Sequence, residues 1–275
     1  MKKLLLAIIA FSGAMACFAQ TDTSSKEQVD TIRVGGMIII KKKGPDGKER
    51  RDIEISNRKK RKNANITTNW NIIDIGFANF NDNTDYSKAQ ASGFLGAGVG
   101  EDQFDLRTGK SVNINYWLFM QRLNLVKHVV NLKYGLGLEL NNYRFDDERV
   151  RFNKNPTQIT LDPALASVKK NKLAADYVTV PVMLNFNFTP RNKRGFGLSA
   201  GMSAGYLYSS RQKIKDGGDK NKLHDDFDLR KWKLSYIGEL SLGPVRLYGS
   251  YAMKSMWEKE LDQTPYSVGI RISSM

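Results

Sequence analysis

The sequence predicts an all-β chain, an eight-stranded antiparallel up-and-down transmembrane β-barrel. Three observations support this fold class. Apolar residues recur at every second position in several segments, and the gaps between these segments alternate in length. After the first 20 residues, no stretch is apolar enough for a spanning helix, so a membrane would have to be crossed by strands.

The chain opens with a segment typical of export. Two lysines precede an apolar run over residues 4–11, and small residues then lead to Ala19, after which cleavage is expected. The run is shorter than the roughly 20 apolar residues that a spanning helix needs. Residues 1–19 are therefore predicted to be a signal peptide. Its removal would leave a mature chain without cysteine, because Cys17 is the only one.

Residues 20–66 are expected to form a basic periplasmic extension. From Lys41 to Lys62 there are eleven basic and four acidic residues, and a Pro-Asp-Gly turn between two β-prone runs predicts a small hairpin. A solvated tether is favoured over a specific docking site, and both interpretations stay open. The basic residues singled out are Lys41, Lys42, Lys43, Arg58, Lys59, Lys60, Arg61 and Lys62.

The barrel itself is expected over residues 67–275. The alternation is clearest in residues 129–141, and in residues 111–126 it slips after Met120. The strand lengths are close to the roughly 9–11 residues that cross a bilayer when tilted. The predicted strands are residues 69–80, 111–126, 129–141, 178–188, 196–209, 232–242, 245–254 and 266–273.

The gaps between the strands give an independent signal. Outer-membrane barrels have short turns in the periplasm and long loops outside, whereas a soluble β-sandwich has no reason to sort its loops by parity. Because the number of strands is even, both termini are expected in the periplasm, with the barrel in the outer membrane. The gaps are long at 81–110, 146–176 and 210–229, short at 127–128, 189–195 and 243–244, and of medium length at 257–265.

The two faces of each strand are expected to meet different surroundings. In a closed barrel the apolar face meets lipid, and the other face points into a narrow lumen where opposite charges neutralise one another. A soluble ligand-binding barrel would invert this pattern. The residues predicted to face lipid include Leu132, Leu136, Leu138, Val180, Val182, Leu184 and Phe186. The residues predicted to form a lumen charge network are Lys133, Glu139, Lys231, Lys233, Glu239, Arg246 and Arg271.

Few motifs suggest chemistry. The stretch "GFLGAGVG" at residues 93–100 lacks the Gly-Lys-Ser/Thr ending of a phosphate loop, so a flexible outer loop is expected. His128 and His224 are predicted at opposite ends of the barrel, and without cysteines no metal site and no cofactor are expected. His224 with Asp225 and Asp226 could serve as a base for a serine. A lipid-modifying enzyme, an acyltransferase or deacylase, therefore stays the alternative to a non-enzymatic role.

The net charge of +15, from 43 basic and 28 acidic residues, first suggests nucleic acid as a partner. Export and the periodic apolar faces argue against that class. The expected partners are outer-membrane lipid and periplasmic or secretion-system proteins.

Several sequence features together resemble a known family. These are the signal ending Phe18-Ala19-Gln20, the Lys/Arg-rich run, Thr68-Asn69-Trp70, and the stretches "LVKHVVNLKYGLGLELNNY" and "YVTVPVMLNFNF". They resemble the outer-membrane β-barrel proteins of the Bacteroidota, a family that includes the PorT component of type IX secretion. The likeness covers about residues 67–275. It implies a barrel without catalytic residues and favours an envelope or secretion-accessory role.

Overall fold

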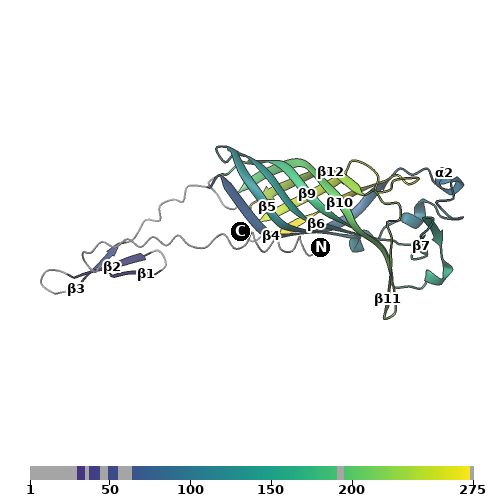
Figure 1. The fold of residues 1–275 in the computed structure, drawn as a ribbon, viewed down its shortest axis with the longest axis horizontal. Helices are drawn as coiled ribbons and strands as arrows, with labels where there is room; N and C mark the ends of the chain where they lie inside the picture. The colour runs from purple at the N-terminus through teal and green to yellow at the C-terminus, as the bar shows by residue number, and fades with distance from the viewer. Residues whose placement is uncertain (1–29, 35–36, 44–48, 55–63, 191–194, 273–275) are drawn as a thin grey trace, which may run out of the picture. The chain divides into compact units, whose positions relative to one another are not determined.

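The computed structural model describes residues 30–34, 37–43, 49–54, 64–190 and 195–272. The chain divides into two units, Met1–Lys62 and Asn63–Met275. The second unit contains a closed ring of eight antiparallel strands (Figure 1). The strands of the ring are β4 (Ile66–Asp82), β5 (Val112–Val126), β6 (Val130–Arg144), β9 (Lys170–Asn187), β10 (Phe196–Asp216), β12 (Trp232–Leu242), β13 (Val245–Ala252) and β14 (Gln263–Ile272).

Each strand of the ring pairs with its neighbours in chain order. The ring closes between its last and first strands, where β14 pairs with β4 from Gln263 opposite Asp82 to Ile272 opposite Ile73. Closure leaves no open sheet edge, which is the condition for a sheet to span lipid. The predicted fold class, an all-β antiparallel up-and-down barrel of eight strands, is confirmed.

The interruption of alternation in β5 lies earlier than the sequence indicates. The pairing of β4 with β5 skips Asn71 and Leu118, and Asn71 has a positive φ of 54°. Trp117 and Met120 both point inward as a result, while Leu118 between them is exposed. The phase therefore changes at Leu118 and not after Met120, because an extra residue in a strand turns the following side chains to the other face.

Exposed aromatic side chains gather near both ends of the ring. Trp70, Phe188 and Phe196 lie near the short turns and are 55–65% exposed. A second set lies near the long connections. Two such bands separated by aliphatic side chains are the pattern of interfacial girdles. The second set comprises Tyr206, Tyr208, Trp232, Tyr236, Tyr251 and Tyr266.

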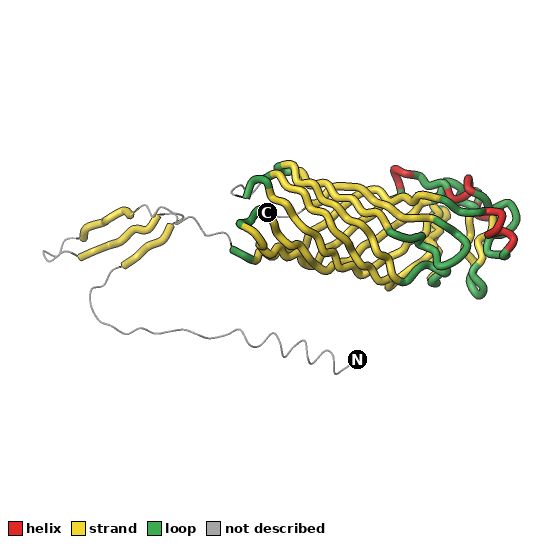
Figure 2. The backbone as a smooth tube through the Cα atoms, turned by 90° about the horizontal axis from the view of Figure 1, so that it is seen from above, coloured by secondary structure: helices red, strands yellow, loops and turns green. Residues whose placement is uncertain are grey.

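The long connections fold into a compact cap at one end of the ring. Figure 2 shows the helical turns of the second unit in red, all at this end. The cap is built on a contiguous apolar core, in which Phe152 stacks on Trp257 with ring centroids 6.0 Å apart and also contacts Phe145 and Phe227. The cap elements are α2 (Tyr86–Ala91), η1 (Glu101–Phe104), η2 (Thr108–Lys110), β7 (Val150–Asn153), β8 (Gln158–Leu161), η3 (Pro163–Leu165) and β11 (Asp219–His224).

The glycine-rich stretch at residues 93–100 belongs to this core. Phe94, Leu95 and Val99 are buried, and the backbone of the stretch exchanges hydrogen bonds with Ile159. The expectation of a flexible loop is therefore wrong. Its apolar side chains pack under β8 (Gln158–Leu161), an interaction between residues far apart in the sequence.

The first unit contains a small antiparallel sheet of β1 (Asp30–Val34), β2 (Met37–Lys43) and β3 (Glu49–Glu54). β2 pairs with β3 from Ile38 opposite Glu54 to Lys43 opposite Glu49. These two strands flank the predicted Pro-Asp-Gly turn. The predicted signal peptide at 1–19 and the basic run at 58–62 lie outside the described residues.

Candidate functional site

The lumen of the barrel holds a buried network of charged side chains centred on Arg271. Its Nε donates to Asp74 Oδ1 at 2.7 Å and its Nη2 donates to Asp74 Oδ2 at 2.8 Å. Nη1 of the same guanidinium donates to Glu239 Oε1. Arg271 lies on β14 and Asp74 on β4, so this pair joins the last strand of the ring to the first.

Two lysines complete the ion pairs. Lys133 Nζ donates to the second oxygen of Glu239, and Lys233 Nζ donates to Glu139 Oε1. Lys233 also lies over the ring of Tyr177, with 4.9 Å from Nζ to the centroid. A cation held both by a carboxylate and by an aromatic face has lost most of its water but kept favourable electrostatic contacts.

Amide side chains connect the two groups of charges. Asn113 donates to Asn141 Oδ1 at 2.8 Å, and Asn141 in turn donates to Glu139 Oε1 at 3.1 Å. Asn113 also donates to Asn115 Oδ1 at 3.2 Å, and Asn115 donates to Asp74 Oδ2 at 3.4 Å, an oxygen that also accepts from Trp117 Nε1 at 2.7 Å. The network therefore spans the lumen from wall to wall.

The charges of this network balance, since Asp74, Glu139 and Glu239 face Lys133, Lys233 and Arg271. Removing ions from water is costly, and mutual pairing is what makes their burial tolerable. The pocket that Asp74, Glu139, Glu239 and Arg271 line has a volume of about 30 Å³, room for about one water molecule. The lumen is filled by side chains at this level.

The sequence matches the family described as outer membrane protein beta-barrel domain over residues 106–253, more than half of the chain. The chain belongs to this family. It is an outer-membrane β-barrel protein. The matched region runs from just before β5 to just after β13, and β4 and β14 complete the ring of this outer-membrane barrel. No curated protein matches the sequence.

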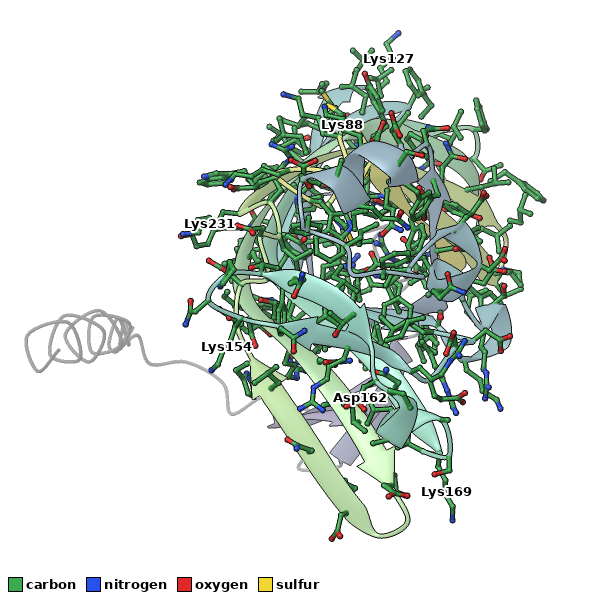
Figure 3. The ribbon with its side chains drawn as sticks, turned by 90° about the vertical axis from the view of Figure 1, so that its right-hand side faces the viewer. Lys88, Lys127, Lys154, Asp162, Lys169 and Lys231 are labelled. Atoms are coloured by element: carbon green, nitrogen blue, oxygen red, sulfur yellow. The ribbon has the colours of Figure 1, made fainter. Side chains whose placement is uncertain are left out.

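Of the seven residues predicted for the lumen of the outer-membrane barrel, the structure brings five together. Lys133, Glu139, Lys233, Glu239 and Arg271 all lie in the network described above. The other two lie outside this group of ion pairs. Lys231 is exposed at the rim, just before β12 begins, so its predicted place in the network is wrong (Figure 3). Arg246 is half-buried near the short-turn end, where it lines a small polar pocket with Arg122 and Asn185.

Asp74 is the charged member of the network that the sequence analysis missed. It is completely buried and accepts both hydrogen bonds of the Arg271 fork. Ile73, Ile75 and Phe77 are exposed on the outward face, so the alternation around Asp74 contains the signal that it points inward. The alternation is interrupted near the start of β4, at Asn71, and this interruption hides the signal.

The residues predicted to face lipid all lie on the outward face of the outer-membrane barrel. Val180, Val182, Leu184 and Phe186 on β9 are 38–49% exposed, and Leu138 on β6 is 36% exposed. Leu132 and Leu136 are half-buried between outward neighbours. An apolar exterior opposite a polar, hydrogen-bonded lumen is the arrangement that lipid requires of a barrel.

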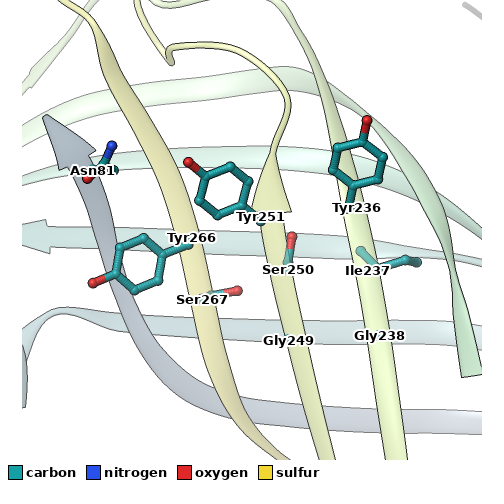
Figure 4. Close-up of a pocket in the computed structure, with 9 residues that line it drawn as sticks. All are labelled: Asn81, Tyr236, Ile237, Gly238, Gly249, Ser250, Tyr251, Tyr266 and Ser267. Atoms are coloured by element: carbon teal, nitrogen blue, oxygen red, sulfur yellow. The ribbon is translucent and has the colours of Figure 1, made fainter. Parts of the chain in front are cut away.

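A groove in the exterior wall lies between β12, β13 and β14 (Figure 4). Its volume is about 680 Å³, and the rings of Tyr236, Tyr251 and Tyr266 flank it. Gly238 and Gly249 face each other across its floor, and a Cβ on either would meet nothing closer than 3.7 Å. Paired glycines thus leave a depression in an apolar wall, beside hydroxyl groups that belong at a membrane interface.

The histidines lie at opposite ends of the barrel. His128 occupies the turn between β5 and β6, and His224 ends β11 on the cap side. Within the described part of the chain, no group of His, Cys, Asp and Glu side chains has the arrangement of a metal site. The described residues also include no helix long and apolar enough to cross a membrane.

Several titratable groups of the cap have shifted pKa values, among them Tyr86 and Asp147. Burial, together with the hydrogen bond that its hydroxyl donates to Asp82 Oδ2 at 2.7 Å, raises the pKa of Tyr86 well above its ordinary value. The hydrogen bonds from Arg149 lower the pKa of Asp147. The first interaction ties the start of α2 to the end of β4, and the second lies within the segment that leads from β6 to β7. Neither group has an evident catalytic partner among the described residues.

Proposed function

We propose that this protein is a non-enzymatic accessory component of the outer membrane, a PorT-like barrel that serves the envelope or secretion and does not conduct solutes. The observation that carries the proposal is the filled interior. A neutral ion-pair network occupies the lumen, and a cap with its own apolar core covers one mouth. Eight strands leave only enough interior for side chains, which suits an anchor and not a pore.

The proposed orientation places the cap outside the cell and both termini in the periplasm. The short turns at 127–129 and 243–244 are the type found on the periplasmic side of such barrels. The basic extension, which includes Lys41, Lys42 and Lys43 at the end of β2, would then meet periplasmic or secretion-system proteins, while the barrel wall meets lipid.

The alternative of a lipid-modifying enzyme requires a histidine and a serine held together. His224 lies opposite Arg211 across the β10–β11 pair, and Asp225 accepts a hydrogen bond from Ser210 through its backbone carbonyl. No hydrogen bond between the imidazole of His224 and a serine hydroxyl occurs among the described residues. This arrangement favours the non-enzymatic proposal.

The first test is conductance of the purified barrel in planar bilayers. We expect no stable current, because ion-paired side chains fill the described lumen and the cap covers one mouth. A sixteen-stranded porin, which encloses an aqueous channel, serves as the positive control. Reproducible long-lived channels of roughly nanosiemens size would contradict the proposal.

The second test is co-isolation of the intact protein from native outer membranes. The variant Lys41→Gln/Lys42→Gln/Lys43→Gln, in which the charge of β2 is removed, is compared with the wild-type chain. We expect secretion-system or envelope proteins to accompany the wild-type chain and to be depleted with the variant. Release or transfer of acyl chains by the purified wild-type barrel would instead support the enzyme.

A further inference from the structure

β9 and β10 extend beyond the ring and present a surface crowded with cations. Past the bulge between Leu207 and Ser209, the two strands stay paired from Asp176 to Lys170, with β6 on one side and β11 on the other. We refer to the basic side chains on the barrel-exterior side of these strands as the cationic face. Its members are Arg144, Lys170, Lys172, Arg211, Lys213, Lys215, Lys220 and Lys222.

The strand register aligns these cations in rows. Arg144 lies opposite Lys172, Lys172 opposite Lys213, and Lys213 opposite Lys222, so four cations form one row across four strands. Lys170, Lys215 and Lys220 form the next row. Directly opposite residues have Cβ atoms about 4.5–5.5 Å apart, and like charges at that separation are destabilising. An arrangement that costs stability calls for a compensating anion.

The protein itself supplies little of that compensation. Among the described residues, the ion pair within the cationic face is that of Arg211 with Asp176. Lys172 Nζ contacts the neutral amide oxygen of Asn142. Nε of Arg144 is buried without a hydrogen-bond partner in the described part of the chain, although its Nη2 donates to the carbonyl of Lys169 at 2.6 Å. Donors therefore outnumber the acceptors that face them.

The titration of Lys172 reflects the same crowding. This residue lies beyond the aromatic girdle marked by Tyr206 and Tyr208, so it is outside the membrane-spanning part of β9. Burial, followed by the positive charges of Lys170 and Lys213, lowers the pKa of Lys172 to about 8. A bound anion would raise the pKa of Lys172 and so oppose the effect of the neighbouring cations.

The position of the cationic face indicates what kind of anion it meets. It continues the same exterior side that carries Val178, Val180 and Val182 within the ring. β10 and β11 bend away from the barrel axis, and their hairpin projects to one side of the barrel in Figures 1 and 3. A wall that bends outward turns its exterior side back toward the membrane. The cations therefore lie just past the girdle, at the level of lipid headgroups.

We propose that the cationic face binds the phosphate groups of the phosphorylated glycolipid in the outer leaflet. The proposal rests on the orientation given under the proposed function, in which the cap lies outside. Lysine and arginine side chains form charge-assisted hydrogen bonds with phosphate oxygens, and several cations in two rows can engage more than one phosphate at once. Binding would offset the repulsion within each row.

The test compares two charge-matched variants in phosphatidylcholine nanodiscs. The first, Lys172→Gln/Lys213→Gln/Lys222→Gln, removes most of one row. The control, Lys88→Gln/Lys254→Gln/Lys259→Gln, removes three exposed lysines elsewhere on the cap side. The probes are diphosphoryl lipid A, dephosphorylated lipid A and inorganic phosphate. Native mass spectrometry measures retained lipid, and thermal unfolding reports the folded state.

We expect the row variant to bind diphosphoryl lipid A at least about tenfold more weakly than wild type, since several charge-assisted contacts are lost. The affinity of the control variant for diphosphoryl lipid A should stay within about twofold of the wild-type value. Without lipid A, the row variant should unfold at a higher temperature than wild type, because repulsion has been removed. That rise also establishes that the variant folds.

Three results would overturn the proposal. The first is equal retention of diphosphoryl lipid A by the row variant and by wild type. The second is equally tight binding of dephosphorylated lipid A, which would assign the affinity to acyl chains. The third is inorganic phosphate that binds wild type as tightly as the lipid, which would make this a site for soluble phosphate. None of these outcomes depends on conductance or co-isolation, so the proposed function is tested separately.

Discussion

At the scale of single residues, Arg271 joins two carboxylates of the lumen network. It is 9% exposed, and its guanidinium contacts two carboxylates from different strands. Breaking a buried ion pair from one side leaves an uncompensated charge, which costs far more than the net value of the pair. Removing Asp74 would likewise leave the buried positive charge of Arg271 without one of its two carboxylates.

We expect Arg271→Met to lower the free energy of unfolding by about 3–5 kcal/mol, because Asp74 loses its only paired cation in the described lumen. Denaturant titration in lipid vesicles measures this. The exposed Lys231→Met should change stability by less than about 0.5 kcal/mol. Adding Asp74→Leu to Arg271→Met should recover part of the loss. A loss equal to that of Lys231→Met would contradict the assigned network.

A second residue-scale prediction concerns pH and Lys172. Its pKa in the folded chain, about 8, is below the ordinary value of 10.5. Between these values the unfolded chain binds the proton more often than the folded chain, so the free energy of unfolding rises with pH across this window. Below about pH 8 the contribution of Lys172 is constant and unfavourable.

The measurement is unfolding in lipid vesicles at several pH values within that window. Wild type should gain stability with pH relative to Lys172→Gln, and the exposed Lys254→Gln should follow wild type. Parallel curves for wild type and Lys172→Gln would show that Lys172 does not titrate abnormally.

At the scale of elements, depth in the membrane distinguishes one strand position from another. Val182 lies midway along the exposed apolar part of β9, whereas Leu242 is the last residue of β12 at the short-turn end. Both side chains point outward and are 49% and 41% exposed. Their exposure is similar, so only depth separates them.

We expect Val182→Arg to cost about 2–4 kcal/mol of folding free energy in lipid, and Leu242→Arg about 0–1 kcal/mol. A guanidinium at mid-membrane must be removed from water, while one at the interface reaches the headgroups. Reversible folding into vesicles measures both values. Equal costs would show that β9 and β12 are not placed across the bilayer as described.

At the scale of the whole molecule, the distribution of short and long connections predicts topology. Protease added to intact cells should cut the chain near residues 215–222, where Gly217 and Gly218 form an exposed turn flanked by lysines. Cleavage at 169–172 is expected next. The lysines at 41–43 should be spared, because the proposed orientation places them behind the outer membrane.

Mass spectrometry of the fragments identifies the cut sites, and a periplasmic marker that stays uncut shows that the membrane is intact. Early cleavage at 41–43 with an intact marker would reverse the topology. The basic extension would then be exposed at the cell surface, and its partners would have to be sought outside the cell.

The sequence alone was sufficient for the ring, its faces and most of the lumen charges. Alternation has a period of two whatever the surroundings, so outward residues such as Val182 and inward residues such as Glu139 could be read directly from position. The match of residues 106–253 agrees with this fold. The bulge at Leu118 and the early strand irregularity explain why Asp74 was overlooked.

Only the tertiary structure decided the cap and the cationic face. The core around Phe152 and Trp257 joins connections far apart in the chain, and such contacts leave no local periodicity to read. The row of Arg144, Lys172 and Lys213 depends on register between strands, which alternation within one strand does not specify. Local pattern determines which face a residue occupies, whereas register and long-range packing determine what it meets there.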